Sequence, residues 1–179
     1  QSSSGGNPTI VESASEGASN PDQHLYVVNN TIVNNKGSGT FVYNYSTTDA
    51  LLQNNIFQGA GTIVSGPNTQ TTNWATSNAY LLDAPNYDFH LTASSTGAID
   101  AGTSPGTGIN GFNMNPVSQY VHPCSDQARP TSGTLDIGGY EYLTPLPVAQ
   151  FSLTSSSGSE SATSVNLTVT LNQTSTSVV

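Results

Sequence analysis

The pair Asn-Asn followed by apolar residues occurs twice in this sequence, as NNTIV from position 29 and as NNIFQ from position 54. The second copy follows the first by 25 positions, which is close to the length of one coil of a β-solenoid. Equivalent positions in successive coils of a parallel solenoid lie directly over one another, about 4.8 Å apart. The repeat therefore predicts stacked coils, and it restricts the fold more than any other feature.

The repeated asparagines are expected to form ladders along the stack. Asn29 would lie over Asn54, and Asn30 over Asn55. An amide side chain has two donor hydrogens and an acceptor oxygen, so it can bond to the coil above and the coil below. Asn also tolerates the left-handed backbone angles that tight bends require. We therefore predict that the Asn pair marks a corner of each coil.

The rest of the first 80 residues indicates strands and not helices. No apolar pattern there keeps a 3.6-residue period for three turns. Short β-branched or aromatic runs alternate instead with Gly, Asn and Asp. We expect an all-β fold in which Ile32 and Ile56 are the inward-facing residues after each corner. The strand-like runs are 9–11, 24–28, 31–33, 39–45, 50–53, 56–58 and 62–64.

Two longer segments carry a family resemblance. The phrase NNTIVNN resembles the coils of bacterial right-handed parallel β-helix proteins. The segments YDFHLTASSTGAIDAGTS (87–104) and ARPTSGTLDIGGYEY (128–142) resemble the C-terminal end of β-helix proteins of the choice-of-anchor Q type. The chain differs from that pattern at Thr96-Gly97, where Ser-Pro is usual, and at Gly139, where Ala is usual. The resemblance covers about residues 8–142.

This resemblance implies a right-handed parallel β-helix over residues 1–143, with a closing region at about 80–143. The closing motif would contain four charged residues. For Arg129 we expect an ion pair with either Asp136 or Glu141. The motif residues are Asp100, Arg129, Asp136 and Glu141.

The sequence changes character at residues 144–148, where two prolines indicate a linker. Residues 149–179 contain the phrases FS, SESA and VNLTVTL, and this segment resembles the start of an immunoglobulin-like Calx-beta domain. A complete sandwich of that class needs about seven strands and about 100 residues. We therefore expect an incomplete β segment or a donor strand. Val165, Leu167, Val169 and Leu171 alternate with polar residues over this stretch.

The composition excludes some partners. Charged residues are 7% of the chain, against roughly 25% in ordinary soluble proteins. Two basic residues against eleven acidic ones give a net charge of −9, so the chain cannot neutralise phosphates and we exclude nucleic acid as a partner. No apolar run reaches the roughly 20 residues that span a bilayer, so no membrane insertion is expected. The polar, weakly charged sequence is typical of a secreted, extracellular or cell-surface protein.

No catalytic site is expected. A lyase acting on uronic acids needs a cationic group near the substrate carboxylate, and only Lys36 and Arg129 are available. Lys36 lies in a predicted turn, where a solvated lysine is the simpler interpretation. A glycoside hydrolase needs paired carboxylates, whereas the acids here are scattered singly.

Metal binding is expected to be weak at best, and no cofactor is predicted. The three histidines have no metal-ligand spacing, and Cys124 is the only cysteine. Asp83 and Asp88 flank a turn, and Glu160 matches a Glu that Calx-beta domains place near calcium. Carboxylates that cap turns are far commoner than such calcium sites.

Surface modification and sugar contact give further candidates. Asn29 lies in a glycosylation sequon, but its place in a ladder conflicts with modification. The other sequons are candidate glycosylation sites at Asn44, Asn166 and Asn172. A row of Tyr26, Tyr43 and Tyr45 is a candidate for stacking on a polysaccharide, although strand aromatics more often belong to the core.

Two functions remain open from the sequence. The first is a non-catalytic extracellular structural protein that polymerises head to tail into a surface fibre or stalk, through its β-helix ends and strand addition by the tail. The second is the C-terminal scaffold of a larger secreted adhesin or polysaccharide-binding or polysaccharide-degrading protein. A glutamine at position 1 is typical of a processed mature end or of an excised fragment.

Overall fold

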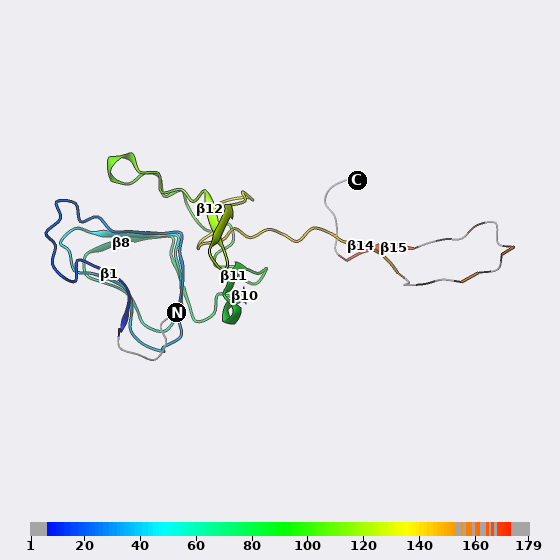
Figure 1. Ribbon diagram of the computed structural model, residues 1–179, viewed down its shortest axis with the longest axis horizontal. Helices are drawn as coiled ribbons and strands as arrows, with labels where there is room; N and C mark the ends of the chain where they lie inside the picture. The colour runs from blue at the N-terminus through cyan, green and yellow to red at the C-terminus, as the bar shows by residue number, and fades with distance from the viewer. Residues whose placement is uncertain are drawn as a thin grey trace. The chain divides into compact units, whose positions relative to one another are not determined.

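Nine short strands form three parallel sheets in the computed structural model (Figure 1), which describes residues 7–152, 155, 157–158, 160–161, 164, 166 and 168–172. The sheets have the orders β1-β4-β7, β2-β5-β8 and β3-β6-β9, so each coil contributes one strand to each sheet. This is the parallel β-helix that the repeat predicts. The coils are β1 (Thr9–Ser13), β2 (Tyr26–Val28) and β3 (Thr31–Asn34); β4 (Thr40–Asn44), β5 (Ala50–Gln53) and β6 (Ile56–Gly59); and β7 (Thr62–Ser65), β8 (Asn68–Thr71) and β9 (Trp74–Thr76).

The coils shorten along the stack, but one corner keeps its length. Between the second and third sheets the bend is always two residues long, at 29–30, 54–55 and 72–73. The turn between the first and second sheets shortens from 14–25 to 45–49 and then to 66–67. The spacing of 25 residues therefore holds once at the fixed corner and is followed by a spacing of 18.

Large side chains fill the interior of the coils. Phe41 and Phe57 are fully buried and meet edge to face, with ring centroids 5.3 Å apart. Burying an aromatic side chain of this size removes a large apolar area from water, so these two rings anchor the middle coil. The interior cluster consists of Val27, Phe41, Val42, Ala50, Leu52 and Phe57.

The prediction for Ile32 and Ile56 is partly wrong. Ile32 pairs in register with Phe57, and Ile56 pairs with Thr31, so the two isoleucines do not stack. Successive side chains of a strand point to opposite faces, and Phe57 is the one that enters the coil interior. Ile56 instead belongs to a second cluster outside the coil, with Leu91, Ala98 and Ile137 of the closing region.

The closing region consists of two antiparallel hairpins, two short 3₁₀ turns and connecting segments. The first hairpin is β10 (Leu81–Asp83) with β11 (Asp88–Leu91), joined through η1 (Ala84–Asn86). The second hairpin is β12 (Ser118–Val121) with β13 (Ser125–Ala128), and η2 (Ile109–Gly111) precedes it. The segment around Gly138 packs closely on Ile56, because a Cβ there would lie 2.7 Å from Ile56 Cδ1. The closing region therefore covers the outer face of β6.

The chain divides into two units, Gln1–Leu143 and Thr144–Val179. In the second unit, β14 (Ala149–Phe151) pairs antiparallel with β15 (Val169–Leu171). Val169 and Leu171 alternate with Thr170 as expected, while Val165 and Leu167 lie outside the described residues. No helix in the part of the chain that the structure describes is long and apolar enough to cross a membrane.

Candidate functional site: the coil ends and the closing region

The fixed corner is built by two asparagine ladders. Asn29 and Asn54 have φ angles of 56° and 55°, the left-handed region that Asn tolerates better than most residues. The Asn54 amide donates to Asn29 Oδ1 at 3.0 Å. Asn54 Oδ1 in turn accepts from the Thr72 hydroxyl at 2.5 Å, so the ladder continues into the third coil through a threonine.

The second ladder is longer than the sequence repeat indicates. Asn30 Nδ2 donates to Asn55 Oδ1 at 3.2 Å, and Asn55 Nδ2 donates to Asn73 Oδ1 at 3.0 Å. Asn55 Nδ2 also donates to the Val27 carbonyl at 2.6 Å. The sequence repeat does not reveal Asn73, because Asn73 follows Asn55 by 18 residues and not by 25, and because its neighbour is Thr72 and not a second Asn.

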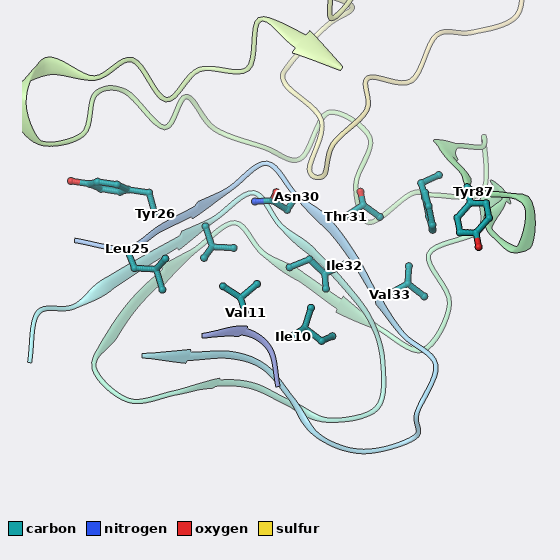
Figure 2. A pocket seen from close by; sticks show the side chains of 11 residues that line it. Ile10, Val11, Leu25, Tyr26, Asn30, Thr31, Ile32, Val33 and Tyr87 are labelled. Atoms are coloured by element: carbon teal, nitrogen blue, oxygen red, sulfur yellow. The ribbon is translucent and has the colours of Figure 1, made fainter. Parts of the chain in front are cut away.

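The first coil leaves an open apolar end. Within the described residues, each strand of this coil pairs on one side only. A cavity of about 500 Å³ lies at this end, and Figure 2 shows Val11, Leu25 and Ile32 directed into the coil interior. The cavity continues over the edge of β3 to Val33 and Tyr87, which lie on the outer side of that strand in Figure 2. The cavity is therefore an apolar hollow bordered by the unpaired edges of the first coil, as far as the described residues show.

The third coil leaves the opposite edges unpaired within the same described residues. Its Ile63 and Val64 pack against the interior cluster and are only partly buried. Gln70, which pairs in register with Leu52, is exposed and donates to Asn68 Oδ1 at 3.1 Å. The third coil therefore ends in a more polar surface than the first.

The short strands at both ends contain few of the residues that protect a sheet edge against pairing. Exposed sheet edges are normally blunted by charged residues, proline or bulges. Among the six end strands (β1, β2, β3, β7, β8 and β9), Glu12 is the only charged residue and none contains proline. The residues of these strands therefore do little to block pairing with a further strand.

The closing motif gathers around a buried arginine. Arg129 pairs with Glu141, with Nη2 and Nε both 3.2 Å from Glu141 Oε2. Its guanidinium also donates to the carbonyl oxygens of Gly138, Asp136 and Tyr140. Of the two expected ion-pair partners, the structure shows Glu141 as the carboxylate, whereas Asp136 contributes its backbone oxygen. A guanidinium group has five N–H donors in a fixed plane, so this one side chain can donate hydrogen bonds to several turns of the chain.

The two aspartates of the motif hold loops through backbone N–H groups. Asp136 accepts from the N–H of Asp100 and of Tyr142, both at 2.6 Å, and Asp100 accepts from the Thr134 N–H at 2.7 Å. Burial raises the pKa of the Asp136 carboxyl above its ordinary value, and these hydrogen bonds oppose the shift. The motif is thus occupied by structural contacts and leaves no carboxylate pair directed at a cleft.

Two of the candidate calcium ligands, Asp83 and Asp88, are register partners in the β10–β11 hairpin, and both already accept hydrogen bonds. Asp83 accepts from the Asn86 amide at 2.8 Å, and Asp88 accepts from His90 Nδ1 at 2.6 Å. Glu160 is exposed and lies in the second unit. No group of three or more His, Cys, Asp or Glu side chains that could hold a metal ion occurs in the described part of the chain.

One predicted glycosylation site is contradicted. Asn44 is 1% exposed, and its amide nitrogen donates to the carbonyls of Thr48 and Pro67 at 2.7 and 2.8 Å. A glycan on that nitrogen would have no room and would displace both bonds. Asn166 and Asn172 are exposed, so they stay candidate sites.

The lysine and the tyrosine row are also placed by the fold. Lys36 Nζ donates to the Asn7 carbonyl at 3.0 Å. Tyr43 and Tyr45 stack on each other at 3.9 Å between ring centroids, and Tyr45 is 49% exposed. The Tyr26 hydroxyl accepts from the Ile109 N–H at 2.9 Å and so fastens the loop near η2 to the first coil. The three rings do not act as one row.

Fold and site together define an all-β protein built on a parallel β-helix. Comparison with known protein families, curated proteins and solved structures finds no match for this chain. The choice-of-anchor Q and Calx-beta resemblances therefore stay hypotheses.

Proposed function

We propose that this chain is a non-catalytic, extracellular structural protein that stacks head to tail into a fibre or stalk. One observation carries the proposal: among the described residues, three strand edges surround an open apolar cavity at the first coil, and three strand edges have no paired strand at the third. Such ends are heterologous surfaces, and repeated heterologous contacts build filaments. The family resemblances to secreted β-helix proteins support the same proposal.

The strand edges supply most of the contact in this proposal. Stacking β1, β2 and β3 of one copy on β7, β8 and β9 of the next would continue all three sheets. Each added strand would satisfy backbone groups that otherwise bond only to water. The cavity beside Val11, Leu25 and Ile32 would be closed by Ile63 and Val64 of the neighbour, which removes apolar surface from water.

A lysine placed at the open end tests this contact. Ile32→Lys puts a charge into the cavity, and burying it under the next coil is costly. We expect the wild-type protein to form filaments in negative-stain electron microscopy and the variant to remain dispersed. Leu82→Lys is the matched control, because Leu82 is 61% exposed on β10 and does not line the cavity. Dispersed wild-type particles, or filaments of the Ile32→Lys variant, would contradict the proposal.

The difference between the two ends favours a second candidate. The first coil is open and apolar, whereas the third presents Asn68 and Gln70. A preceding coil of the same polypeptide would cover the apolar end at least as well as a second copy. In that case the chain is the C-terminal scaffold of a larger secreted adhesin or polysaccharide-active protein. An intact mass larger than that of 179 residues, measured on natural material, distinguishes this candidate from the fibre.

A further inference from the structure

A second pocket, of about 370 Å³, lies between the two hairpins of the closing region. This volume falls in the range of pockets that hold small molecules. Tyr140, which is 6% exposed, is the most buried ring that lines it, whereas Tyr87 and Tyr120 are roughly half exposed. The lining residues are Asn86, Tyr87, Asp88, His90, Tyr120, Val121, His122, Gln127 and Tyr140.

Aromatic rings dominate this pocket. Tyr87 stacks on His122 with centroids 5.2 Å apart and an interplanar angle of 12°. Tyr120 meets the same histidine edge to face at 6.3 Å, and His90 lies 4.2 Å from the Tyr140 ring. These contacts fix three phenol rings around one space. Fixed rings lose little conformational entropy when a ligand binds.

The only charged side chain in the lining, apart from any protonated histidine, is the Asp88 carboxylate. Its Oδ1 accepts from His90 N and Nδ1 at 3.1 and 2.6 Å, and its Oδ2 has no hydrogen-bond partner within the described residues. Burial acts to raise the pKa of Asp88, but the bonds from His90 outweigh it and hold the pKa below its usual value. The group is therefore a carboxylate at neutral pH.

No lysine or arginine offsets this charge. Lys36 bonds to Asn7, and Arg129 is buried against Glu141, so neither of the two basic residues of the chain lines the pocket. Burial raises the pKa of the Tyr140 phenol, and the nearby Asp88 charge adds to the shift, which agrees with a negative environment. With a net charge of −9, the chain disfavours anionic ligands here.

We propose that the pocket binds a small organic cation with an alkylated ammonium group, such as choline. Electron-rich ring faces attract such a group through cation–π interaction, and a carboxylate beside the rings adds Coulombic attraction. A bare metal ion fits less well, because Asp88, His90 and His122 line the pocket but do not form a group that could hold a metal ion among the described residues. A neutral sugar could use the rings but would gain nothing from the charge of Asp88. The inference does not depend on the proposed fibre.

Isothermal titration calorimetry on the whole chain tests the cation directly. Choline is compared with 3,3-dimethylbutan-1-ol, which has the same shape without the charge. We expect choline to bind and the neutral isostere to bind at least about 10-fold more weakly. Equal affinities, or no binding of choline at concentrations of tens of millimolar, would overturn the proposal.

Two variants tie the binding to this pocket. Tyr120→Leu removes a ring, and Asp88→Asn removes the charge while keeping the shape. Each should weaken choline about 3- to 30-fold, while Tyr45→Leu, which changes an exposed tyrosine on the coil, should leave the affinity unchanged. Circular dichroism verifies folding, and if Tyr120→Leu does not fold then Asp88→Asn decides. Unchanged affinity in Asp88→Asn, or tighter binding of methyl glucoside than of choline, would refute a cation site.

An alkylated ammonium group could come from a lipid headgroup or from a soluble molecule, and a vesicle-binding experiment distinguishes the two sources. Co-sedimentation with phosphatidylcholine vesicles that is lost in Asp88→Asn would assign the group to a lipid. Binding of free choline without co-sedimentation would assign it to a soluble or polymer-borne cation. Both outcomes support the site.

Discussion

At the scale of single residues, asparagine solves two problems at the fixed corner. Asn29 and Asn54 adopt left-handed angles, while Asn30 and Asn55 bond along the stack. Burial increases from Asn30, which is exposed, to Asn55, which is 0% exposed. A buried amide without its partners costs more than an exposed one, because water cannot replace the lost bonds.

Asn55→Ala should therefore destabilise the protein far more than Asn30→Ala. The first change leaves the Asn30 N–H and the Val27 carbonyl without the Asn55 amide. We expect a loss of about 2–4 kcal/mol in the free energy of unfolding for Asn55→Ala and below about 1 kcal/mol for Asn30→Ala. Urea denaturation followed by circular dichroism measures both. Similar losses for the two variants would show that the ladder is not the source of stability.

The same corner shows where sequence reasoning succeeds and where it stops. The Asn pairs were predictable because two copies repeat at one spacing. Ile56 and Phe57 are both apolar, so the alternation of the sequence does not indicate which of them enters the coil. The closing region packs on Ile56, and Phe57 therefore faces the interior. The sequon at Asn44 was misleading for a similar reason, since a three-residue motif contains no information about burial.

At the scale of elements, the guanidinium group of one arginine connects several loops of the closing region. Arg129 bonds to Glu141 and to three backbone carbonyls between residues 136 and 140. Burial lowers the pKa of Arg129, and the Glu141 charge opposes that shift. A buried pair of this kind makes the removal of one partner severe, because the other charge is left in a site without water.

Arg129→Met should lower the free energy of unfolding by about 3–5 kcal/mol. The change leaves the buried Glu141 carboxylate without its cation and three backbone carbonyls without their hydrogen-bond donor. Glu141→Gln should cost less, because its amide oxygen still accepts from the guanidinium. Trp74, the only tryptophan, packs against the closing region, so its fluorescence reports this element during denaturation. A loss in Glu141→Gln as large as that in Arg129→Met would contradict this account.

Elements beyond the second coil were only partly predictable. The third coil repeats at 18 residues and has Thr72 in place of the first Asn, so no phrase in the sequence marks it. The pocket between the hairpins combines residues from 86 to 140. Side chains so far apart in the chain meet only through tertiary packing, which a local pattern cannot reveal.

At the scale of the whole molecule, the second unit offers an apolar face of its own. Phe151 pairs with Val169, and Ala149 with Leu171, so these four exposed side chains share one face of the β14–β15 hairpin. Gln150 and Thr170 occupy the opposite face. An isolated two-stranded hairpin is marginal in water, and a face of this kind suits addition to a neighbouring subunit.

Phe151→Asp should therefore reduce assembly without affecting the coils. If the tail joins subunits, the charge disrupts its apolar face, and we expect shorter filaments or none in electron microscopy. Gln150→Asp puts the same charge on the same strand but on the polar face, and it should assemble like the wild type. Thermal unfolding followed at Trp74 should be unchanged in both variants, because Trp74 belongs to the first unit. Filaments of normal length in Phe151→Asp, or after deletion of residues 148–179, would mean that the coil ends assemble without the tail.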